Sequence, residues 1–238
     1  MIRLAFLAAA LAMVVAAPLA AAERIATVTD FDRIRIEGAF VVEVTAARST
    51  TARVSGTPGA VEATQLTVQG RTLVVRRDRQ AWSSDARRDT GAPMVRVTLP
   101  ALQGASISGS ASLAVDALRG PRLSLSVEGS GRISVLRVDA ERLDTAIVGA
   151  GTMKLSGTAK DFGTLVRGAG TLDAGALTVS DAKIVSESSG QVMLAATRSA
   201  RITAAGSGSV VVTGKPACTV TNTGSGSVTC GLDQPQRR

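Results

Sequence analysis

The chain has 238 residues, a formal net charge of +8 at pH 7 and no histidine. Without histidine, neither a Ser-His-Asp nor a Cys-His catalytic site can form, and the common zinc ligand sets are excluded. Hydrophobic residues make up 45% of the chain but aromatic residues only 2%. A compact core usually relies on aromatic side chains for buried area, so this composition favours a thin core of Val, Ile, Leu and Ala.

The first 22 residues have the pattern of a secretory signal peptide. Arg3 gives a positive start, residues 4–17 form an apolar run, and residues 20–22 (Ala-Ala-Ala) fit a small-x-small cleavage site. The apolar run has 14 residues, whereas a membrane-spanning helix needs roughly 20. We therefore expect export and cleavage before Glu23, with an uncleaved anchor as the alternative, and no transmembrane segment in the mature chain.

Residues 27–102 predict short strands that are joined by turns. Gly38, Gly56 and Gly70 each separate two short runs in which apolar and polar residues alternate. Such alternation around a glycine is typical of strand–turn–strand units. We expect irregular rungs over 27–102, the last strand being closed by Pro100, and no sustained helix.

A polar insert at residues 76–93 interrupts this pattern and contains the single tryptophan of the chain. Its candidate binding residues are Arg76, Arg77, Arg79, Trp82, Arg87 and Arg88. An aromatic ring beside basic groups can stack on sugars or bases. Interleaved aspartates weaken this interpretation, and an exposed loop between strands is the alternative. If one edge of the fold carries a specific binding site, we expect it at this insert.

From residue 103 to 230 the chain repeats a small-residue corner. The corners begin at Gly109, Gly129, Gly149, Gly168, Ser188, Gly206 and Gly224. They lie 18 to 20 residues apart, and a fixed period of this length is the mark of a solenoid in which each repeat forms one rung. A flexible Gly/Ser linker is the alternative, but it would not carry apolar residues at fixed distances on both sides.

Apolar residues flank the corners at fixed positions. They lie four and six positions after the first corner residue, as Leu113 and Val115 do after Gly109. Steps of two are typical of a strand whose alternate side chains point inward. We expect each repeat to form a strand, a tight corner, a second strand and a looser connection, and the rungs to stack as parallel sheets about 4.8 Å apart. Glycine suits the corner because it adopts positive φ and lets successive corners approach closely.

Cys218 and Cys230 fall at inward-facing positions of the last rung. A close pair in an exported protein usually oxidises, so we predict a disulfide that staples the open end of the solenoid. A bridge that closes 13 residues adds about 3 kcal/mol in the chain-entropy model. Two buried free thiols are the alternative, and a redox-active pair is disfavoured because the Cys-x-x-Cys spacing is missing. The polar tail, residues 233–238, is expected to fray.

The acidic residues of the repeats show no common position. They are Asp116, Glu128, Asp139, Glu141, Asp144, Asp161, Asp173, Asp181 and Glu187. Glycoside hydrolysis needs two carboxylates roughly 5 to 10 Å apart, which stacked rungs could supply only by accident. We therefore expect no catalytic residues, no metal site and no cofactor.

Residues 31–42, with the sequence Phe-Asp-Arg-Ile-Arg-Ile-Glu-Gly-Ala-Phe-Val-Val, resemble the opening of the head GIN domain of auto-transporter adhesins. The Gly-Arg-Thr-Leu-Val-Val element at 70–75, the strand at 95–102 and the Gly-Ser-Gly corners are similar to that family as well. The resemblance extends from Val28 to Val228. It implies an all-β, single-domain right-handed parallel β-helix over 23–232, located in the bacterial envelope and without catalytic residues. The chain departs from the family in its polar insert and its paired cysteines.

Two functions fit these observations. The first is a non-catalytic envelope module for adhesion or scaffolding, in the periplasm or on the outer cell surface, that displays its sheet faces to a glycan or a protein. The second is a polyanion- or glycan-binding protein whose binding through the insert falls with rising salt and when its arginines are neutralised. A β-helical polysaccharide-active enzyme is the third possibility. We expect no nucleic-acid partner, and exposed solenoid edges could let copies associate as homo-oligomers.

Overall fold

The computed structural model describes residues 22–28, 30–78 and 92–232. Apart from Ala22, the predicted signal peptide lies outside these ranges, as do the polar tail and most of the insert. No helix within the described ranges is both long and apolar enough to cross a membrane.

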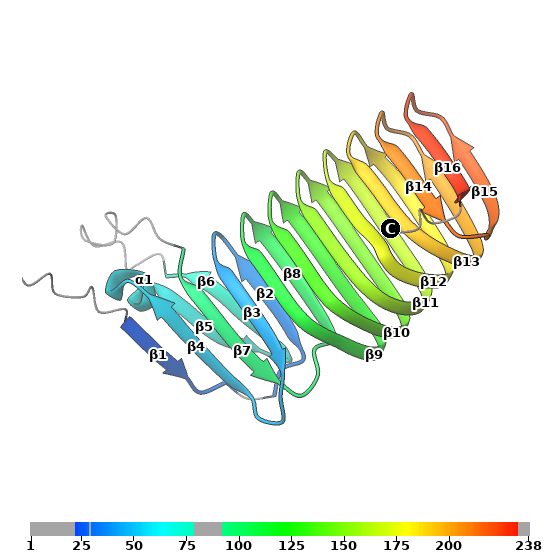
Figure 1. The fold of residues 1–238 in the computed structure, drawn as a ribbon. Coiled ribbons are helices and arrows are strands. Elements are labelled where there is room, and N and C mark those ends of the chain that lie inside the picture. Colours follow the sequence, from blue (N-terminus) through cyan, green and yellow to red (C-terminus); the bar gives the residue numbers. More distant parts are fainter. Residues whose placement is uncertain (1–21, 29, 79–91, 233–238) are drawn as a thin grey trace, which may run out of the picture.

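Sixteen strands and one short helix make up the described part of the chain. In order they are β1 (Ala22–Ala26), β2 (Arg33–Glu37), β3 (Val41–Ala46), β4 (Thr51–Gly56), α1 (Pro58–Glu62), β5 (Thr64–Gln69), β6 (Thr72–Arg77), β7 (Met94–Leu99), β8 (Gly104–Gly109), β9 (Ser112–Gly129), β10 (Arg132–Gly149), β11 (Thr152–Gly168), β12 (Thr171–Ser188), β13 (Gln191–Ala204), β14 (Ser209–Thr213), β15 (Ala217–Asn222) and β16 (Ser227–Leu232). Figure 1 shows an elongated stack with sharp corners along its upper margin and smooth bends along its lower margin.

The strands form one continuous hydrogen-bonded sheet that folds over into two facing layers. Layer 1 has the order β1-β4-β7-β3, followed by the first halves of β9 to β13, then β14 and β16. Layer 2 has the order β5-β6-β2-β8, followed by the second halves of β9 to β13, then β15. The strand pairs of β9 to β16 are all parallel, so the predicted β-solenoid is confirmed.

The predicted loose connection between the two strands of a rung is wrong. Each of β9 to β12 runs without a break from one corner to the next and bends halfway, so the same strand belongs to both layers. Rungs of unequal length are matched at these bends, where the register shifts, for example between Val135 and Val138 of β10. The backbone therefore keeps its ladder partners around most of the rung, and no loop is needed.

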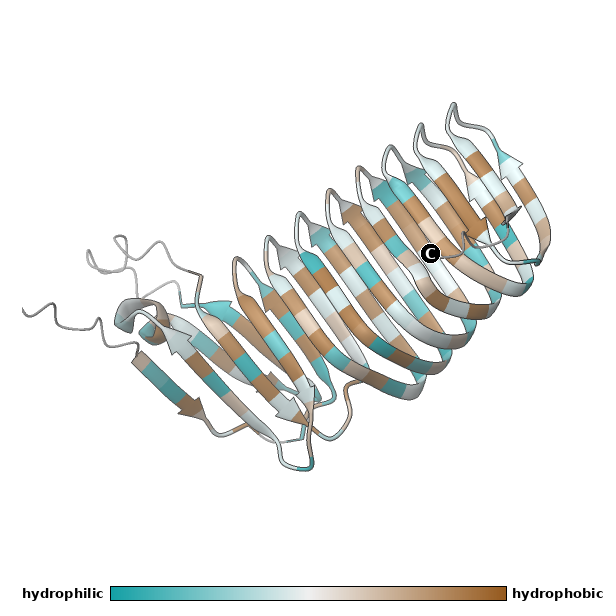
Figure 2. Ribbon diagram, viewed as in Figure 1, coloured by the Kyte–Doolittle hydropathy of each residue, from teal (hydrophilic) through white to brown (hydrophobic). Residues whose placement is uncertain are grey.

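Alternate side chains of both layers point into the space between them and form the core. Ile133, Val135 and Leu143 of one rung are at most 1% exposed, and the equivalent residues of neighbouring rungs are buried as well. Figure 2 shows these residues as brown bands that continue from strand to strand. Only every second side chain of a rung points inward, so the core between the two layers is thin and consists mainly of aliphatic side chains. This explains the low aromatic content.

The corners confirm both roles expected of glycine. Gly129 and Gly149 have φ of 110° and 112°. A Cβ on Gly149 would lie 2.6 Å from the carbonyl oxygen of Gly129, so any side chain there would collide with the corner below. The stacked corners are also hydrogen-bonded, since the amide of Ala150 donates to the Gly129 oxygen at 2.9 Å.

Gly38 begins an eighth corner, in addition to the seven predicted from the repeat. Its φ is 107°, and its amide donates to the carbonyl of Ser108 at 2.9 Å, directly below the Gly109 corner. The sequence does contain the signal, because Val42 and Val44 lie four and six positions after Gly38 and are buried. The corner has no serine, and a long insertion separates it from the regular array.

The N-terminal strands are not simply irregular parallel rungs, as the sequence suggested. β4 pairs antiparallel with β1 and β7, and β5 pairs antiparallel with β6. β5 and β6 are joined by the two residues Gly70 and Arg71, and Gly70 has the positive φ of 60° that a tight hairpin turn requires. Tight turns reverse the chain direction, whereas parallel neighbours need a full rung between them.

A five-residue helix, α1, lies at the N-terminal end of the stack, as Figure 1 shows. The hydroxyl of Thr57 accepts a hydrogen bond from the amide of Ala60, and Pro58 occupies the first turn. Ala60 and Val61 are buried, so the helix covers this end of the core. Five residues are too few to show helical periodicity in the sequence.

The last rung carries the predicted disulfide. It joins Cys218 of β15 to Cys230 of β16, with the Cα atoms 6.3 Å apart, and so connects layer 2 to layer 1. Cys230 packs against the core, but Cys218 is exposed rather than buried. Cys218 is exposed because no described rung follows β15 to cover it.

Candidate functional site

The structure describes two of the six predicted binding residues of the insert. Arg76 and Arg77 end β6 in layer 2, and the Nε of Arg76 donates to the side-chain oxygen of Gln65 at 2.7 Å. Arg77 is exposed. The other four, Arg79, Trp82, Arg87 and Arg88, lie outside the described residues, so this surface stays a prediction.

The expectation that acidic residues share no position in the rungs is wrong. Asp161 and Asp181 are register partners in neighbouring strands of layer 2. Both lie seven positions before the first residue of their corner, so counting backward from the corners could have found them. Asp161 is exposed, whereas Asp181 is held in a network of hydrogen bonds.

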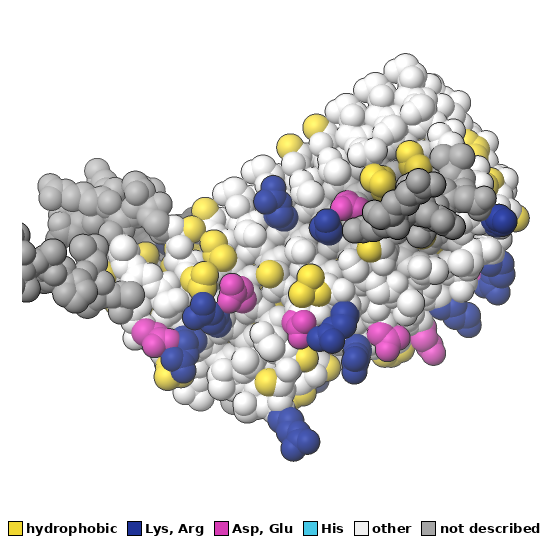
Figure 3. Space-filling view, in the orientation of Figure 1, with side chains coloured by type: hydrophobic (Ala, Val, Ile, Leu, Met, Phe, Trp, Pro, Cys, Tyr) yellow, Lys and Arg dark blue, Asp and Glu magenta, His cyan; other side chains and the backbone are white. Residues whose placement is uncertain are grey.

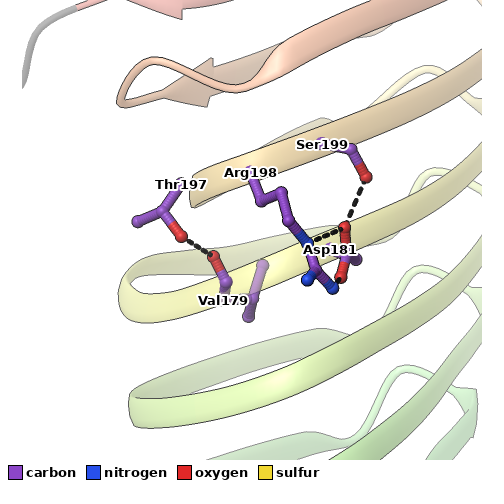
Figure 4. Close-up of polar contacts among 5 residues, drawn as sticks. All are labelled: Val179, Asp181, Thr197, Arg198 and Ser199. Carbon is purple, nitrogen blue, oxygen red and sulfur yellow. Dashed lines mark hydrogen bonds and ion pairs between the residues drawn. The ribbon is translucent and has the colours of Figure 1, made fainter.

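Figure 4 shows the network around Asp181 at the bend of β13. The guanidinium of Arg198 donates two hydrogen bonds to the carboxylate, one of them from Nε at 2.9 Å, and the hydroxyl of Ser199 donates a third at 2.6 Å. The bonds from Arg198, followed by the bond from Ser199, lower the pKa of Asp181 to about 2. Beside this group, the hydroxyl of Thr197 donates to the carbonyl of Val179 at 3.1 Å and ties the two bends together.

Asp181 borders a shallow hollow of about 460 Å³ on the outer face of layer 2, which we call the C-terminal hollow. Its polar lining includes Arg142, Asp161, Lys183, Ser199 and Arg201. Gly163 lies in the same register row as Lys183, and its missing side chain helps to leave the space open.

A second hollow of about 330 Å³ lies on the same face toward the N-terminus, and we call it the N-terminal hollow. Two exposed arginines, Arg33 and Arg35, line it together with small residues such as Gly104, Ser106 and Ser124. The hollows meet at one ion pair, since Arg142 lines the first and Asp144 the second, with 2.8 Å between Nε and Oδ2. The hydrogen bond to Asp144 raises the pKa of Arg142.

One row of outward-facing residues runs through both hollows, and we call it the central row. In register order it is Thr72, Arg33, Gly104, Ser124, Asp144, Gly163, Lys183, Arg201 and Thr219. Lys183 and Arg201 are direct neighbours in this row, although like charges placed opposite each other destabilise a sheet. Within the described residues, neither they nor Arg33 belongs to an ion pair.

On the outer face of layer 1 several basic groups belong to ion pairs, although Arg132 does not within the described part of the chain. There Arg53 pairs with Glu23 and Arg96 pairs with Glu43, at 2.6 and 3.0 Å. Lys154 pairs with an aspartate of the next rung. Figure 3 shows this face, where several basic side chains lie beside acidic ones and others stand apart, with a ridge of uncharged corners above them.

Unpaired basic groups are not confined to layer 2, since Arg119 and Lys160 line a third hollow of about 380 Å³ near the bends without belonging to an ion pair within the described residues. The distinctive feature of layer 2 is that Lys183 and Arg201 lie side by side in one hollow.

This arrangement suits binding more than bond cleavage. Cations and hydroxyl groups in a hollow can hold the carboxylate, sulfate or phosphate groups of a ligand. Among the described residues, no group of three acidic or cysteine side chains could hold a metal ion. Asp181 borders the C-terminal hollow, and because the hydrogen bonds from Arg198 lower its pKa to about 2, it does not suit a general acid near neutral pH.

The fold defines this protein as a long β-solenoid with two broad exposed faces. Residues 30–216 match the model of the family "Putative auto-transporter adhesin, head GIN domain", and the chain belongs to that family. The match ends at the last residue before β15, so the final rung and its disulfide lie beyond it, whereas the resemblance described from the sequence extends to Val228.

Solved structures show the same fold. A putative adhesin from Bacteroides fragilis has 23% identity and a TM-score of 0.80, with 88% of this chain and 96% of that chain covered. A putative adhesin from Parabacteroides merdae has 18% identity and a TM-score of 0.67, with 88% and 95% covered. A putative lipid binding protein from Parabacteroides distasonis has 17% identity and a TM-score of 0.65, with 88% and 96% covered. A search of curated proteins found no match.

Proposed function

We propose that this chain is an exported, non-catalytic adhesin-like module that binds acidic glycans of the cell envelope along the outer face of layer 2. The observation that carries the proposal is the central row, in which Arg33, Lys183 and Arg201 have no acidic partner within the described residues. Unpaired cations such as the neighbours Lys183 and Arg201 are expected to gain most from an anionic ligand.

The spacing of these cations favours a chain-like ligand. Arg33 and Lys183 are five ladder steps apart, or roughly 24 Å at about 4.8 Å for each step. A single anionic group would reach one hollow, whereas an extended acidic polymer would reach both. The hydroxyl groups of Ser124 and Thr219 in the same row are suitable partners for sugar hydroxyls.

Export is supported by independent observations. The N-terminal sequence has the pattern of a signal peptide, and a structural disulfide is typical of an oxidising compartment. The family description points to adhesins, which act outside the cytoplasm. We place the protein in the periplasm or on the outer cell surface of a bacterium.

The test is a binding measurement on protein that starts at Glu23, with an acidic polysaccharide, a neutral polysaccharide and anionic lipid vesicles as separate ligands. Replacing Lys183 and Arg201 by glutamine should weaken binding to the acidic polysaccharide by about tenfold or more, because two charge-assisted contacts are lost. The matched control replaces Arg96 and Lys154 by glutamine, which removes the same charge from layer 1. Equal losses in both variants, or preferential binding to neutral polysaccharide, would contradict the proposal, and preferential binding to vesicles would assign the site to lipid headgroups.

The polar insert remains a second candidate for the binding surface. It follows β6, a strand of layer 2, so it leaves the fold at the N-terminal part of the same layer. Replacing Arg76, Arg77, Arg87 and Arg88 by glutamine tests it in the same assay. A larger loss there than for Lys183 and Arg201 would move the site from the central row to the insert.

A further inference from the structure

The C-terminal end of the solenoid presents two strand edges without charge. β15 pairs with β13 alone and β16 pairs with β14 alone, so one edge of each strand has no partner among the described residues. From Ala217 to Leu232 the sequence contains no Lys, Arg, Asp or Glu. Natural proteins usually protect an exposed edge with charged residues, proline or a covering segment. Neither a charged residue nor a proline occurs within the two strands.

Side chains that would be core in any other rung are exposed at this end. Val220 is 45% exposed, whereas Ile202, its register partner in the preceding rung, is fully buried. Cys218 is exposed as well, while its partner Ala200 is 1% exposed. The last rung thus presents an apolar strip framed by two hydrogen-bonding edges.

This surface is the same kind that each rung presents to the next inside the chain. The corner Gly224-Ser225-Gly226-Ser227-Val228 repeats the sequence of residues 206–210 below it. β16 stacks on β14 in parallel register, with Val228 on Val210 and Cys230 on Val212. The stacking of β16 on β14 therefore shows what the edge of β16 is suited to contact, namely another uncharged strand.

We propose that a second copy of this chain covers the end, in a symmetric dimer that joins the two C-terminal ends. A two-fold axis through both layers places β16 antiparallel to β16 of the second copy and β15 antiparallel to its β15. Both layers then continue across the axis, and Val220 of each copy becomes buried. A closed two-fold pairing uses both open ends at once and leaves no further site for growth.

The opposite end of the chain is a poor partner for this surface. The edge strand of layer 2 there, β5, carries no charge, but the edge strand of layer 1, β1, carries Glu23 and Arg24, and Arg24 donates to the carbonyl of Thr64. The helix α1 covers the core there through Val61. Stacking the uncharged C-terminal end on this end would place charged groups against an apolar strip, which is costly without compensating partners.

The test is the molar mass of the protein that starts at Glu23, measured by sedimentation over a range of concentrations. We expect a dimer for the unmodified protein and a monomer for Val220→Lys, which places a charge in the centre of the proposed contact. Thr221→Lys is the matched control, because the next residue on the same strand points away from the contact and the variant should remain dimeric. Circular dichroism checks that Val220→Lys is folded, which its exposed position favours.

Hydrogen exchange gives a second reading of the same interface. In the unmodified protein, amides of β15 and β16 should become more protected as the concentration rises, and in Val220→Lys they should not. A monomer at all concentrations would overturn the proposal. Assemblies that grow without limit would overturn it too, since they would show head-to-tail stacking, as would equal masses for the two lysine variants.

Discussion

Gly149 occupies its corner for two separate reasons. Its φ of 112° is one that other residues rarely adopt, and a Cβ there would lie 2.6 Å from the oxygen of Gly129. At Gly70 only the first reason applies, because its φ is 60° but no atom lies within 4 Å of the position that a Cβ would take. The repeated glycines therefore reflect stacking as well as backbone conformation.

Alanine at these two positions should have unequal effects on stability. Gly149→Ala should lower the free energy of unfolding by about 2–4 kcal/mol, from backbone strain plus the collision with the corner below. Gly70→Ala should cost about 1 kcal/mol, from strain alone. Urea unfolding followed by circular dichroism measures both. Equal losses would show that stacking contributes little at the corners.

Each rung is an element that contacts only its two neighbours, and the last rung has a single neighbour. The disulfide joins the two strands of this rung at Cys218 and Cys230. In a solenoid, stability is approximately a sum over rungs and their interfaces, so the effect of the bridge should stay local.

Replacing both cysteines by serine should therefore loosen β15 and β16 without affecting the middle of the stack. A loss of about 3 kcal/mol would make hydrogen exchange in these strands roughly a hundred times faster. Amides of β10 and β11 should exchange at their original rates and serve as the internal control. A uniform loss of protection along the chain would show that the solenoid unfolds as one unit.

At the scale of the whole molecule, charge and stability are largely separate. Most of the ion pairs lie on the surface, and the side chains of Arg96 and Glu43, for example, are 57% and 44% exposed. The exception is the pair of Arg71 with Asp32, whose side chain is 10% exposed. Exposed pairs contribute between about 0 and 1 kcal/mol each. Stability comes instead from the aliphatic core and the backbone ladders.

Salt should consequently affect binding far more than folding. Between about 0.05 and 0.5 M NaCl, the thermal midpoint should change by less than about 3 °C, because weak surface pairs are screened while the core is not. Binding to an acidic polysaccharide should fall by at least about tenfold over the same range. Calorimetry and a binding titration in matched buffers measure the two effects. A large fall in the midpoint would mean that the ion pairs do stabilise the fold.

The regular part of the fold follows from the sequence alone. Inward positions such as Leu113 and Val115 are set by a step of two after each corner, and both the period and the corner glycine are local features. Pairing of Cys218 with Cys230 was predictable for the same reason, since both lie at known positions of one rung. Even the eighth corner at Gly38 and the shared position of Asp161 and Asp181 were present as offsets in the sequence.

Only the tertiary structure decided which distant residues become neighbours. Arg33 and Lys183 share one row because β8 is inserted beside β2 and the following rungs continue that register. Antiparallel pairing at the N-terminus, and the exposure of Val220 at the other end, likewise depend on which strand lies next to which. Local periodicity fixes which side chains point inward or outward, whereas the neighbours of a strand depend on how the insertion folds back, which no local pattern encodes.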